Sequence, residues 1–488
     1  MRALSVLILP ALFAACGTPD AGGDAPDDSA AVARVTAGLR PGIVVEGAPT
    51  AKYSLAERMA HYKVPGVSIA VIDGNDARIA WARGFGVKVV GEADSVTPDT
   101  RFQAASISKP VAATALLHMA QEGQLSLDAP VNDYLKSWKL PDNAFTATEK
   151  VTLRRIVSHN AGLTVHGFPG YAVTDSLPTV PQILDGVVPA NTKPVRVDTT
   201  PGSIWRYSGG GFTVAQLAMT EVGGESFPYL MNKFVLAPFG MTNSSYALLL
   251  PAESAGQAAA GHRNDGKMVE GGWHHYPEMA AAGLWTTPTD LMKWAREIAW
   301  ARVGKSKDVL NEKSASEMLT MQKEPSGLGP MLHGSGRAFY FEHGGANEGY
   351  RAQVMYFPEL EKGAAVMTNS DAGGALAQEI LYSLATEYEW PGYGPRTIKP
   401  VAMEGAALDA YAGVYLIGAP EPVRVTVSRE GDKLFFEEPQ YIPRTEVLFL
   451  GEDKVIAPES GMDASFARDA SGKVDRLMIA GMTLKKAN

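Results

Sequence analysis

Two sets of strand-like segments enclose a long region of helical pattern in this chain, and that order restricts the folds open to it. Between about residues 106 and 300, apolar residues recur at helical spacing and Gly/Pro-rich loops separate the segments. Segments rich in β-branched and aromatic residues lie on either side of this region, at residues 67–74, 78–86, 338–342, 352–357 and 364–368. A helix-like stretch follows over residues 375–388. We therefore predict an α/β (α+β) domain over residues 39–390, with a sheet flanked by helices and a helical insertion.

A break rich in Gly and Pro separates the last part of the chain from this domain. Residues 391–400 have the composition of a linker. Beyond them, apolar and polar residues alternate over 423–437 around a Glu-Gly-Asp turn, which predicts a β-hairpin. A second hairpin is expected near residues 469–472. We predict a small C-terminal all-β domain over residues 401–488.

The charge and the cysteine content exclude several classes of function. The 488 residues include 44 Lys and Arg against 53 Asp and Glu, which gives a formal net charge of −9. Lys/Arg-rich runs, which proteins that grip phosphate backbones carry, are absent from the sequence, so we expect no nucleic acid partner. The single cysteine, Cys16, leaves no internal disulfide and no cysteine-based metal site.

The N-terminus has the pattern of an export signal. Arg2 precedes an apolar run over residues 3–13, which is too short to span a bilayer, and Ala-Ala-Cys16 follows. The leader resembles a bacterial lipoprotein signal, which implies a signal peptide over residues 1–16 and lipidation of Cys16. A plain secretory signal is the alternative. Residues 17–38 read as a flexible tether because their first half is small, acidic and without aromatics. We expect an exported, lipid-anchored protein at the periplasm or cell surface, on the outer membrane if the host is Gram-negative.

Ser106 and Lys109 form the sharpest chemical motif. A helix is expected to begin near the serine, and residues three apart share one helix face, so the lysine amine can reach the serine hydroxyl. A serine becomes a nucleophile when a base takes its proton, and a desolvated lysine can act as that base. Such a pair arises by chance about once in a chain of this size, and its simplest alternative is a capping serine beside a solvated lysine.

Two further segments strengthen the motif. Tyr207 precedes a run of three glycines, where backbone can approach a ligand closely. His343 stands on a predicted strand and is followed by Gly344 and Gly345, so a potential cation lies beside open backbone. Each of these residues alone would more often be structural.

The order Ser-x-x-Lys, Tyr, His-x-Gly resembles that of the serine β-lactamase and penicillin-recognising hydrolase family. The resemblance is to the branch with class C β-lactamases, D-stereospecific peptidases, DD-carboxypeptidases and related esterases, and it covers about residues 40–390. Further matching phrases lie at residues 157–163, 238–243 and 281–291. The resemblance implies a β-lactamase-like antiparallel sheet flanked by helices.

The resemblance also implies roles for individual residues. Ser106 would be the acylated nucleophile, and Lys109 and Tyr207 would be the base and proton-shuttle pair. His343, Gly344, Gly345 and Ala346 would form a substrate-binding strand. The oxyanion hole would consist of the backbone N–H groups of Ser106 and Ala346, which need no particular side chain.

Two departures from the family pattern favour peptide or ester substrates over β-lactams. Where the family often has Tyr-x-Asn, this chain has Gly209, so the side-chain amide is missing. Where many β-lactamases have a lysine on the strand, this chain has His343, whose charge would fade above about pH 6.5 unless its surroundings shift it. We further expect loop-fixing hydrogen bonds from His159 and a pocket-wall position for Tyr171.

The sequence therefore predicts an exported serine hydrolase that acts through an acyl-enzyme on a small-molecule or peptide substrate with an amide or ester bond. No cofactor and no metal is expected. A true β-lactamase, a penicillin-binding receptor that does not turn over and a structural lipoprotein with vestigial chemistry are the alternatives. The oligomeric state is left open.

Overall fold

The computed structural model describes residues 28–487 apart from 75–76, 418–422, 439–441, 452, 459–460 and 480–481. The predicted signal peptide, with Cys16, and residues 17–27 of the predicted tether lie outside the described residues. In the described part of the chain, no helix has both the length and the apolar character needed to cross a membrane.

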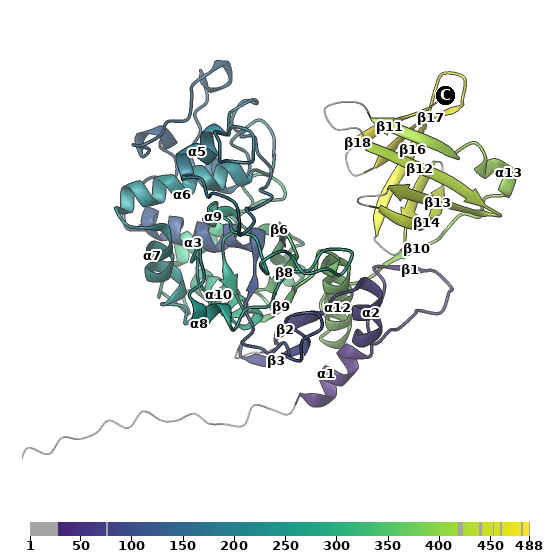
Figure 1. The fold of residues 1–488 in the computed structure, drawn as a ribbon, viewed down its shortest axis with the longest axis horizontal. Helices are drawn as coiled ribbons and strands as arrows, with labels where there is room; N and C mark the ends of the chain where they lie inside the picture. The colour runs from purple at the N-terminus through teal and green to yellow at the C-terminus, as the bar shows by residue number, and fades with distance from the viewer. Residues whose placement is uncertain are drawn as a thin grey trace, which may run out of the picture.

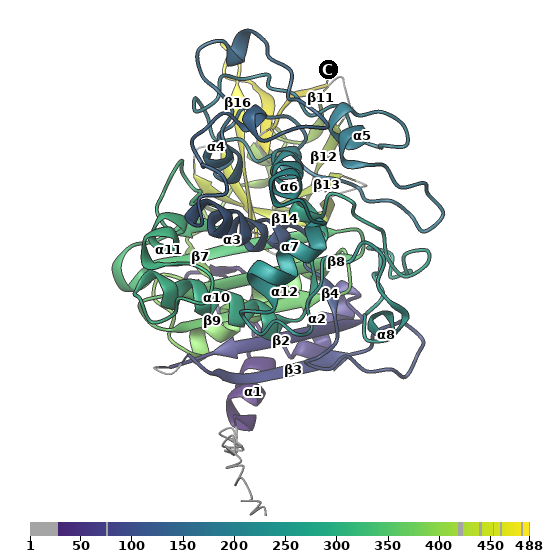
Figure 2. The same ribbon diagram turned by 90° about the vertical axis from the view of Figure 1, so that its left-hand side faces the viewer.

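A six-stranded antiparallel sheet lies at the centre of the larger unit. Its strand order is β3-β2-β9-β8-β7-β6, and Figure 2 shows it crossing the lower half of the molecule with β3 at the outer edge. The strands are β2 (Gly66–Ile72), β3 (Ile79–Gly86), β6 (Met331–His333), β7 (Tyr340–Asn347), β8 (Tyr350–Phe357) and β9 (Lys362–Thr368). The five strands predicted from the sequence are therefore present, and the first and last sets pair directly because β2 lies beside β9.

Helices cover both faces of this sheet, which explains why its central strands are largely apolar. Val67 and Ile69 of β2 pack in one cluster with α12 (Gly373–Glu387), which corresponds to the helix predicted over residues 375–388. Ala70 and Ile72 point to the opposite face and pack in a second cluster with α10 (Pro288–Arg302). Because alternate residues of a strand point to opposite faces, a strand covered on both sides needs apolar residues at most positions.

A helix occupies part of the segment predicted as a tether. Residues 29–36 form α1 (Ser29–Thr36), whose buried Val35 packs with residues of α12. The Arg34 guanidinium pairs with the Glu387 carboxylate at 2.6 Å, and the Ser383 hydroxyl donates to the Val35 carbonyl at 2.8 Å. The small residues of this segment therefore form a helix that the body of the domain stabilises, since an isolated eight-residue helix would be marginal. The next helix, α2 (Leu55–Tyr62), lies beside α12 as well.

The predicted helical insertion lies between β3 and β6. A short pair of strands, β4 (Phe102–Gln103) and β5 (Trp285–Thr286), joins its beginning to its end. Its first long helix is buried on nearly every side, as expected of a helix that is apolar all round. The α-helices from β4 to β6 are α3 (Ser108–Gln121), α4 (Leu153–Val157), α5 (Val180–Asp185), α6 (Gly209–Gly223), α7 (Phe227–Met231), α8 (Ala252–Ala255), α9 (Met279–Ala282), α10 and α11 (Glu312–Met318).

The C-terminal domain is a closed barrel of eight antiparallel strands, so the prediction of a small all-β domain is confirmed. Both predicted hairpins are present, since β12 pairs with β13 and β16 pairs with β17. Eight strands leave an interior that side chains can fill, and Tyr415, Phe436 and Phe466 pack there. The strands are β11 (Gly413–Ile417), β12 (Val423–Glu430), β13 (Lys433–Glu438), β14 (Ile442–Gly451), β15 (Lys454–Ala457), β16 (Met462–Arg468), β17 (Val474–Ile479) and β18 (Met482–Lys486).

A parallel pair of short strands joins the barrel to the larger unit (Figure 1). These strands are β1 (Ile43–Val45) and β10 (Arg396–Ile398). Ile456 of the barrel packs with one isoleucine from each of them, and Arg396 pairs with Asp463 at 2.8 Å. The segment predicted as a linker thus holds the barrel through a small apolar cluster, and the helix α13 (Gly405–Leu408) follows it.

Candidate active site

Ser106 lies in a tight turn at the start of α3. Residues Ala105–Ile107 form one turn of 3₁₀ helix, and α3 begins at Ser108, two residues after Ser106. Ala105 has a φ of 50°, a left-handed conformation that is unfavourable for a residue with a Cβ. The Ser108 hydroxyl holds this turn, because it donates to the Ala105 carbonyl at 2.5 Å and accepts from the Leu284 N–H at 2.9 Å. The two hydrogen bonds of the Ser108 hydroxyl therefore hold the turn that carries Ser106 in place.

The Lys109 amine points at the Ser106 hydroxyl, as the three-residue spacing predicted. Its Nζ lies 2.9 Å from Ser106 Oγ and 2.9 Å from the Ala281 carbonyl oxygen of α9. The lysine is 2% exposed, and burial lowers its pKa from 10.5 to about 7 because a charged amine loses its hydration. About half of the lysine is neutral at pH 7 and has a lone pair free to accept a proton.

Tyr207 completes a triangle with these two residues. Its hydroxyl is hydrogen-bonded to Ser106, and the Lys109 amine lies 4.9 Å from the centre of its ring. Burial raises the pKa of Tyr207 far above its usual range, so the hydroxyl stays protonated. The His159 ring stacks on the tyrosine ring with the centroids 4.2 Å apart, and its Nδ1 accepts from the Ser208 N–H at 3.1 Å. His159 thus has the loop-fixing role that the sequence suggested and also supports the tyrosine.

Strand β7 brings the predicted substrate-binding residues to the same place. A Cβ on Gly345 would lie 2.2 Å from the Ala104 carbonyl oxygen, so glycine allows the strand to pack directly on the serine turn. β6 pairs only with residues 340–342 of β7. From His343 onward, this edge of β7 has no pairing with β6 and lies beside the serine turn. An extended substrate can therefore pair with the backbone of β7 next to Ser106.

The structure corrects one prediction about this strand. His343 was expected to supply a cation that fades above about pH 6.5, but the residue is 3% exposed and its pKa is lowered to about 3. Burial is the main cause, and the positive charge on Lys109 adds to it. The ring Nδ1 lies 2.6 Å from the Gly344 carbonyl oxygen and donates to it. His343 is therefore a neutral imidazole at physiological pH and cannot replace the charge of a lysine.

Ser106, Tyr207 and the residues of β7 from His343 to Ala346 line one pocket of about 440 Å³ that opens over Ser106. Tyr171, expected in the pocket wall, is instead buried and hydrogen-bonded to Glu278. The side chain that the loop contributes is His166, whose ring lies 4.8 Å from that of Tyr207. The lining residues are Ser106, His166, Tyr207, Met331, His343, Gly344, Gly345, Ala346, Arg351, Ala352, Gln353, Gly374, Ala377 and Gln378.

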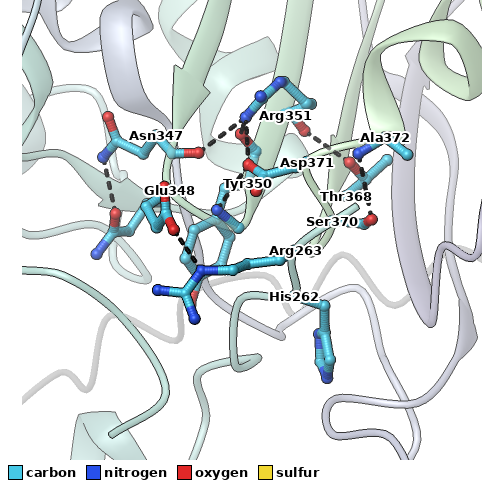
Figure 3. Close-up of polar contacts among 12 residues, drawn as sticks. His262, Arg263, Asn347, Glu348, Tyr350, Arg351, Thr368, Ser370, Asp371 and Ala372 are labelled. Carbon is cyan, nitrogen blue, oxygen red and sulfur yellow. Dashed lines mark hydrogen bonds and ion pairs between the residues drawn. The ribbon is translucent and has the colours of Figure 1, made fainter. Parts of the chain in front are cut away.

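The lining residues of β8 and α12 carried no motif in the sequence. Arg351 and Gln353 alternate along β8 with apolar residues, and Gln378 stands on α12. Figure 3 shows the Arg351 guanidinium between Asn347 and Asp371. Alternation on a strand beside His-Gly-Gly is the only signal that could have indicated them. Among the described residues, no three His, Cys, Asp or Glu side chains are arranged to hold a metal ion.

Comparison with known proteins identifies the family. The model of the Beta-lactamase family matches residues 54–386, more than half of the chain. The chain belongs to the Beta-lactamase family. Its region over residues 54–386 has the β-lactamase fold, and Ser106, Lys109 and Tyr207 lie together within it.

Two relatives match over this region. A D-aminopeptidase from Brucella anthropi is 23% identical over 330 residues, which cover 66% of this chain and 59% of the relative. The Unguisins hydrolase ungD from Aspergillus violaceofuscus is 23% identical over 350 residues, which cover 64% and 60%. The chain thus spans about three fifths of the length of these curated relatives.

Solved structures share the fold. The octameric penicillin-binding protein homologue from Pyrococcus abyssi is 23% identical, with 88% of this chain and 98% of the other covered and a TM-score of 0.56. A Beta-lactamase/D-alanine Carboxypeptidase from Yersinia pestis is 19% identical, with 68% and 97% covered and a TM-score of 0.52.

Proposed function

We propose that this protein hydrolyses amide or ester bonds through an acyl-enzyme on Ser106, as a peptidase, carboxypeptidase or esterase related to β-lactamases. The observation that carries the proposal is the buried Lys109 amine at 2.9 Å from the Ser106 hydroxyl, with the Tyr207 hydroxyl bound to the same serine. A nucleophile, a base with a pKa near the working pH and a proton relay in contact are the parts that acyl transfer requires.

Electrostatics supports Lys109 as the base within this group. Lys109 has a pKa of about 7 and is partly neutral at physiological pH, whereas burial keeps Tyr207 protonated. Lys109 therefore takes the Ser106 proton as the hydroxyl attacks the carbonyl carbon. Tyr207 then donates a proton to the leaving group and regains one from the Lys109 ammonium.

The oxyanion formed in this step is assigned to two backbone N–H groups, those of Ser106 and Ala346. β7 lies against the serine turn through Gly345, so the N–H of the following residue is close to the reacting centre. Fixed dipoles in such a place stabilise the developing charge without reorganisation. Water then attacks the acyl-enzyme with Lys109 again as the base, and the serine is released.

Export and lipid anchoring through Cys16 remain part of the proposal. The support is the leader sequence, with Arg2, an apolar run and small residues before the lone cysteine. Labelling cells with a radioactive fatty acid tests it, with Cys16→Ala as the variant that must lose the label.

The test of the hydrolase proposal compares wild type with Ser106→Ala and with a control, Ser176→Ala, at an exposed serine. Three substrates are used: a chromogenic cephalosporin, a D-Ala-D-Ala peptide and a short-chain nitrophenyl ester. Intact-mass spectrometry detects any acyl adduct. We expect turnover of the peptide or the ester that Ser106→Ala abolishes and Ser176→Ala retains. Turnover of the cephalosporin instead would identify a β-lactamase, a stable adduct without turnover would identify a receptor, and no reaction at all would refute the proposal.

A further inference from the structure

The side chains that line the active-site pocket carry almost no charge. Among the described residues of the lining, none is Asp or Glu, and Arg351 alone has a permanent charge. Its Nη1 donates to the Asp371 carboxylate at 2.9 Å, to the Asn347 carbonyl at 2.8 Å and to the Tyr350 carbonyl at 2.7 Å. The dashed lines in Figure 3 mark its bonds to Asn347 and Asp371, which hold the guanidinium in place. The charge of Arg351 is therefore already paired with that of Asp371.

The titratable residues of the pocket are uncharged too. His343 is a neutral imidazole, and burial together with the charge of Lys109 lowers the pKa of His166. The Lys109 amine lies beneath the pocket and already contacts the serine hydroxyl and the Ala281 carbonyl oxygen.

A nearby carboxylate is shielded from the pocket. Glu342 is bound by the Gln353 side-chain amide, which itself lines the pocket, and it lies 3.1 Å from the His333 ring nitrogen on its other side. Gln378 presents a second amide, whose nitrogen donates to the Tyr393 hydroxyl at 2.7 Å. Apart from Arg351, the polar side chains offered to a ligand are thus two amides, two imidazoles and the hydroxyls of Ser106 and Tyr207. These groups bind carbonyl and N–H groups and cannot neutralise an ion.

Charged substrate ends would find no partner here. A peptide with a free N-terminus next to the scissile bond would bring an ammonium into the pocket, and a carboxypeptidase substrate would bring a carboxylate. Moving either ion out of water without a counter-ion costs several kcal/mol. Resting on the proposed function, we propose that this active site selects acyl substrates that are uncharged on both sides of the scissile bond, namely esters or amides whose neighbouring amine and carboxyl groups are blocked.

Matched pairs of substrates test the inference. On the acyl side, D-alanine p-nitroanilide is compared with its N-acetyl form at pH 7. On the leaving side, a thioester of N-acetyl-D-alanine with thioglycolate is compared with the methyl ester of the same compound. Each kcat/KM is divided by the rate of hydroxide-catalysed hydrolysis, which corrects for intrinsic reactivity. We expect the uncharged member of each pair to be favoured by at least about tenfold, equal to about 1.4 kcal/mol.

Variants at one position test the cause. Gln378→Glu adds a carboxylate to the pocket and Gln378→Lys adds a cation. Gln378 is half-buried, so the end of the new side chain can adjust its position. We expect Gln378→Glu to raise the ratio of charged to uncharged kcat/KM for the amine pair, and Gln378→Lys to raise it for the carboxylate pair, each by about tenfold. Because each ratio is internal to one variant, general damage to the fold cancels.

The outcomes separate this inference from the proposed function. If charged members are hydrolysed as well as uncharged ones in a Ser106-dependent reaction, the hydrolase proposal stands and this inference is refuted. The inference is also refuted if both Gln378 variants leave the ratios unchanged. If no substrate gives Ser106-dependent turnover or an adduct, the proposed function fails and the inference falls with it.

Discussion

Lys109→Met removes the amine proposed as the base while keeping a side chain of similar length. Burial brings the pKa of Lys109 from 10.5 to about 7. At pH 7 a lysine with the unshifted pKa would be neutral in only about one molecule in 3,000. Burial therefore raises the fraction of neutral Lys109 by roughly a thousandfold. Loss of a positioned base typically costs about 10² to 10⁴ in rate. We expect kcat/KM of Lys109→Met to fall by about a thousandfold.

The pH profile of the wild type tests the same reasoning without any substitution. With a nitrophenyl ester, which does not titrate, log kcat/KM should rise with unit slope up to about pH 7 and then level off. At pH 5 about 1% of Lys109 is neutral, so the rate should be about a hundredfold below the plateau. A flat profile between pH 5.5 and 8.5, or a Lys109→Met variant with more than about a tenth of the activity, would refute Lys109 as the base.

Stability supplies an independent readout for Lys109. The folded-state pKa of about 7 lies below the unfolded value of 10.5, so between these values the unfolded state binds more protons. The contribution of Lys109 to the free energy of unfolding therefore rises with pH across that window, and at pH 6 the burial of this lysine costs its full amount. Urea denaturation at pH 6 should show Lys109→Met to be at least as stable as wild type. A loss of activity in this variant would then come from the missing base and not from unfolding.

Three further predictions follow from the same structure. Tyr207→Phe should lower kcat by about a hundredfold with an unchanged melting temperature, because the ring stays stacked while the relay hydroxyl is lost. Gly345→Ala should lower both kcat and the melting temperature, because its Cβ would meet the Ala104 backbone oxygen at 2.2 Å. The control is Gly344→Ala, whose Cβ would meet only the end of a flexible glutamine side chain at 2.8 Å. Equal effects of the two variants would contradict the packing argument. Glu278 is buried and its pKa is raised to about 8 from 4.5, so through this residue the folded state binds more protons between these values. Its contribution to the free energy of unfolding should fall by about 1.4 kcal/mol per pH unit there, against the rise that Lys109 contributes above pH 7. Glu278→Gln should remove this contribution, so the variant should lose less stability than wild type between pH 6 and 8.5 in urea denaturation.

Much of the fold follows from local pattern. The strands of the central sheet were predictable because a strand covered on both faces is apolar at most positions, as β2 and β9 are. The barrel hairpins were predictable from alternation around polar turns. The Ser106 and Lys109 contact follows from helical spacing, since positions three apart share a face. Each of these features depends on neighbours in the sequence.

Features that depend on distant packing were not predictable. The loss of charge on His343 arises because packing buries its ring and places Lys109 nearby, and neither cause is visible in the His-Gly-Gly segment. The helix α1 was missed because its short, small-residue sequence is stabilised by α12, more than 300 residues later in the chain. The spacing of Ala31 and Val35, both buried on one face, was the available signal.

The absence of a side-chain amide at Gly209 and the presence of His166 in the pocket have one structural cause. The Gly209 N–H donates to the His166 carbonyl at 2.9 Å, and a Cβ on Gly209 would lie 3.0 Å from that oxygen and 3.1 Å from the Phe168 ring. A side chain at Gly209 would therefore push the loop away from the N-terminus of α6. Because this chain has glycine there, the loop packs close enough for the His166 ring to reach Tyr207. The substitution that removes a family side chain from the pocket thus admits a different, uncharged polar group, and the chemistry of the pocket changes without any change to Ser106, Lys109 and Tyr207.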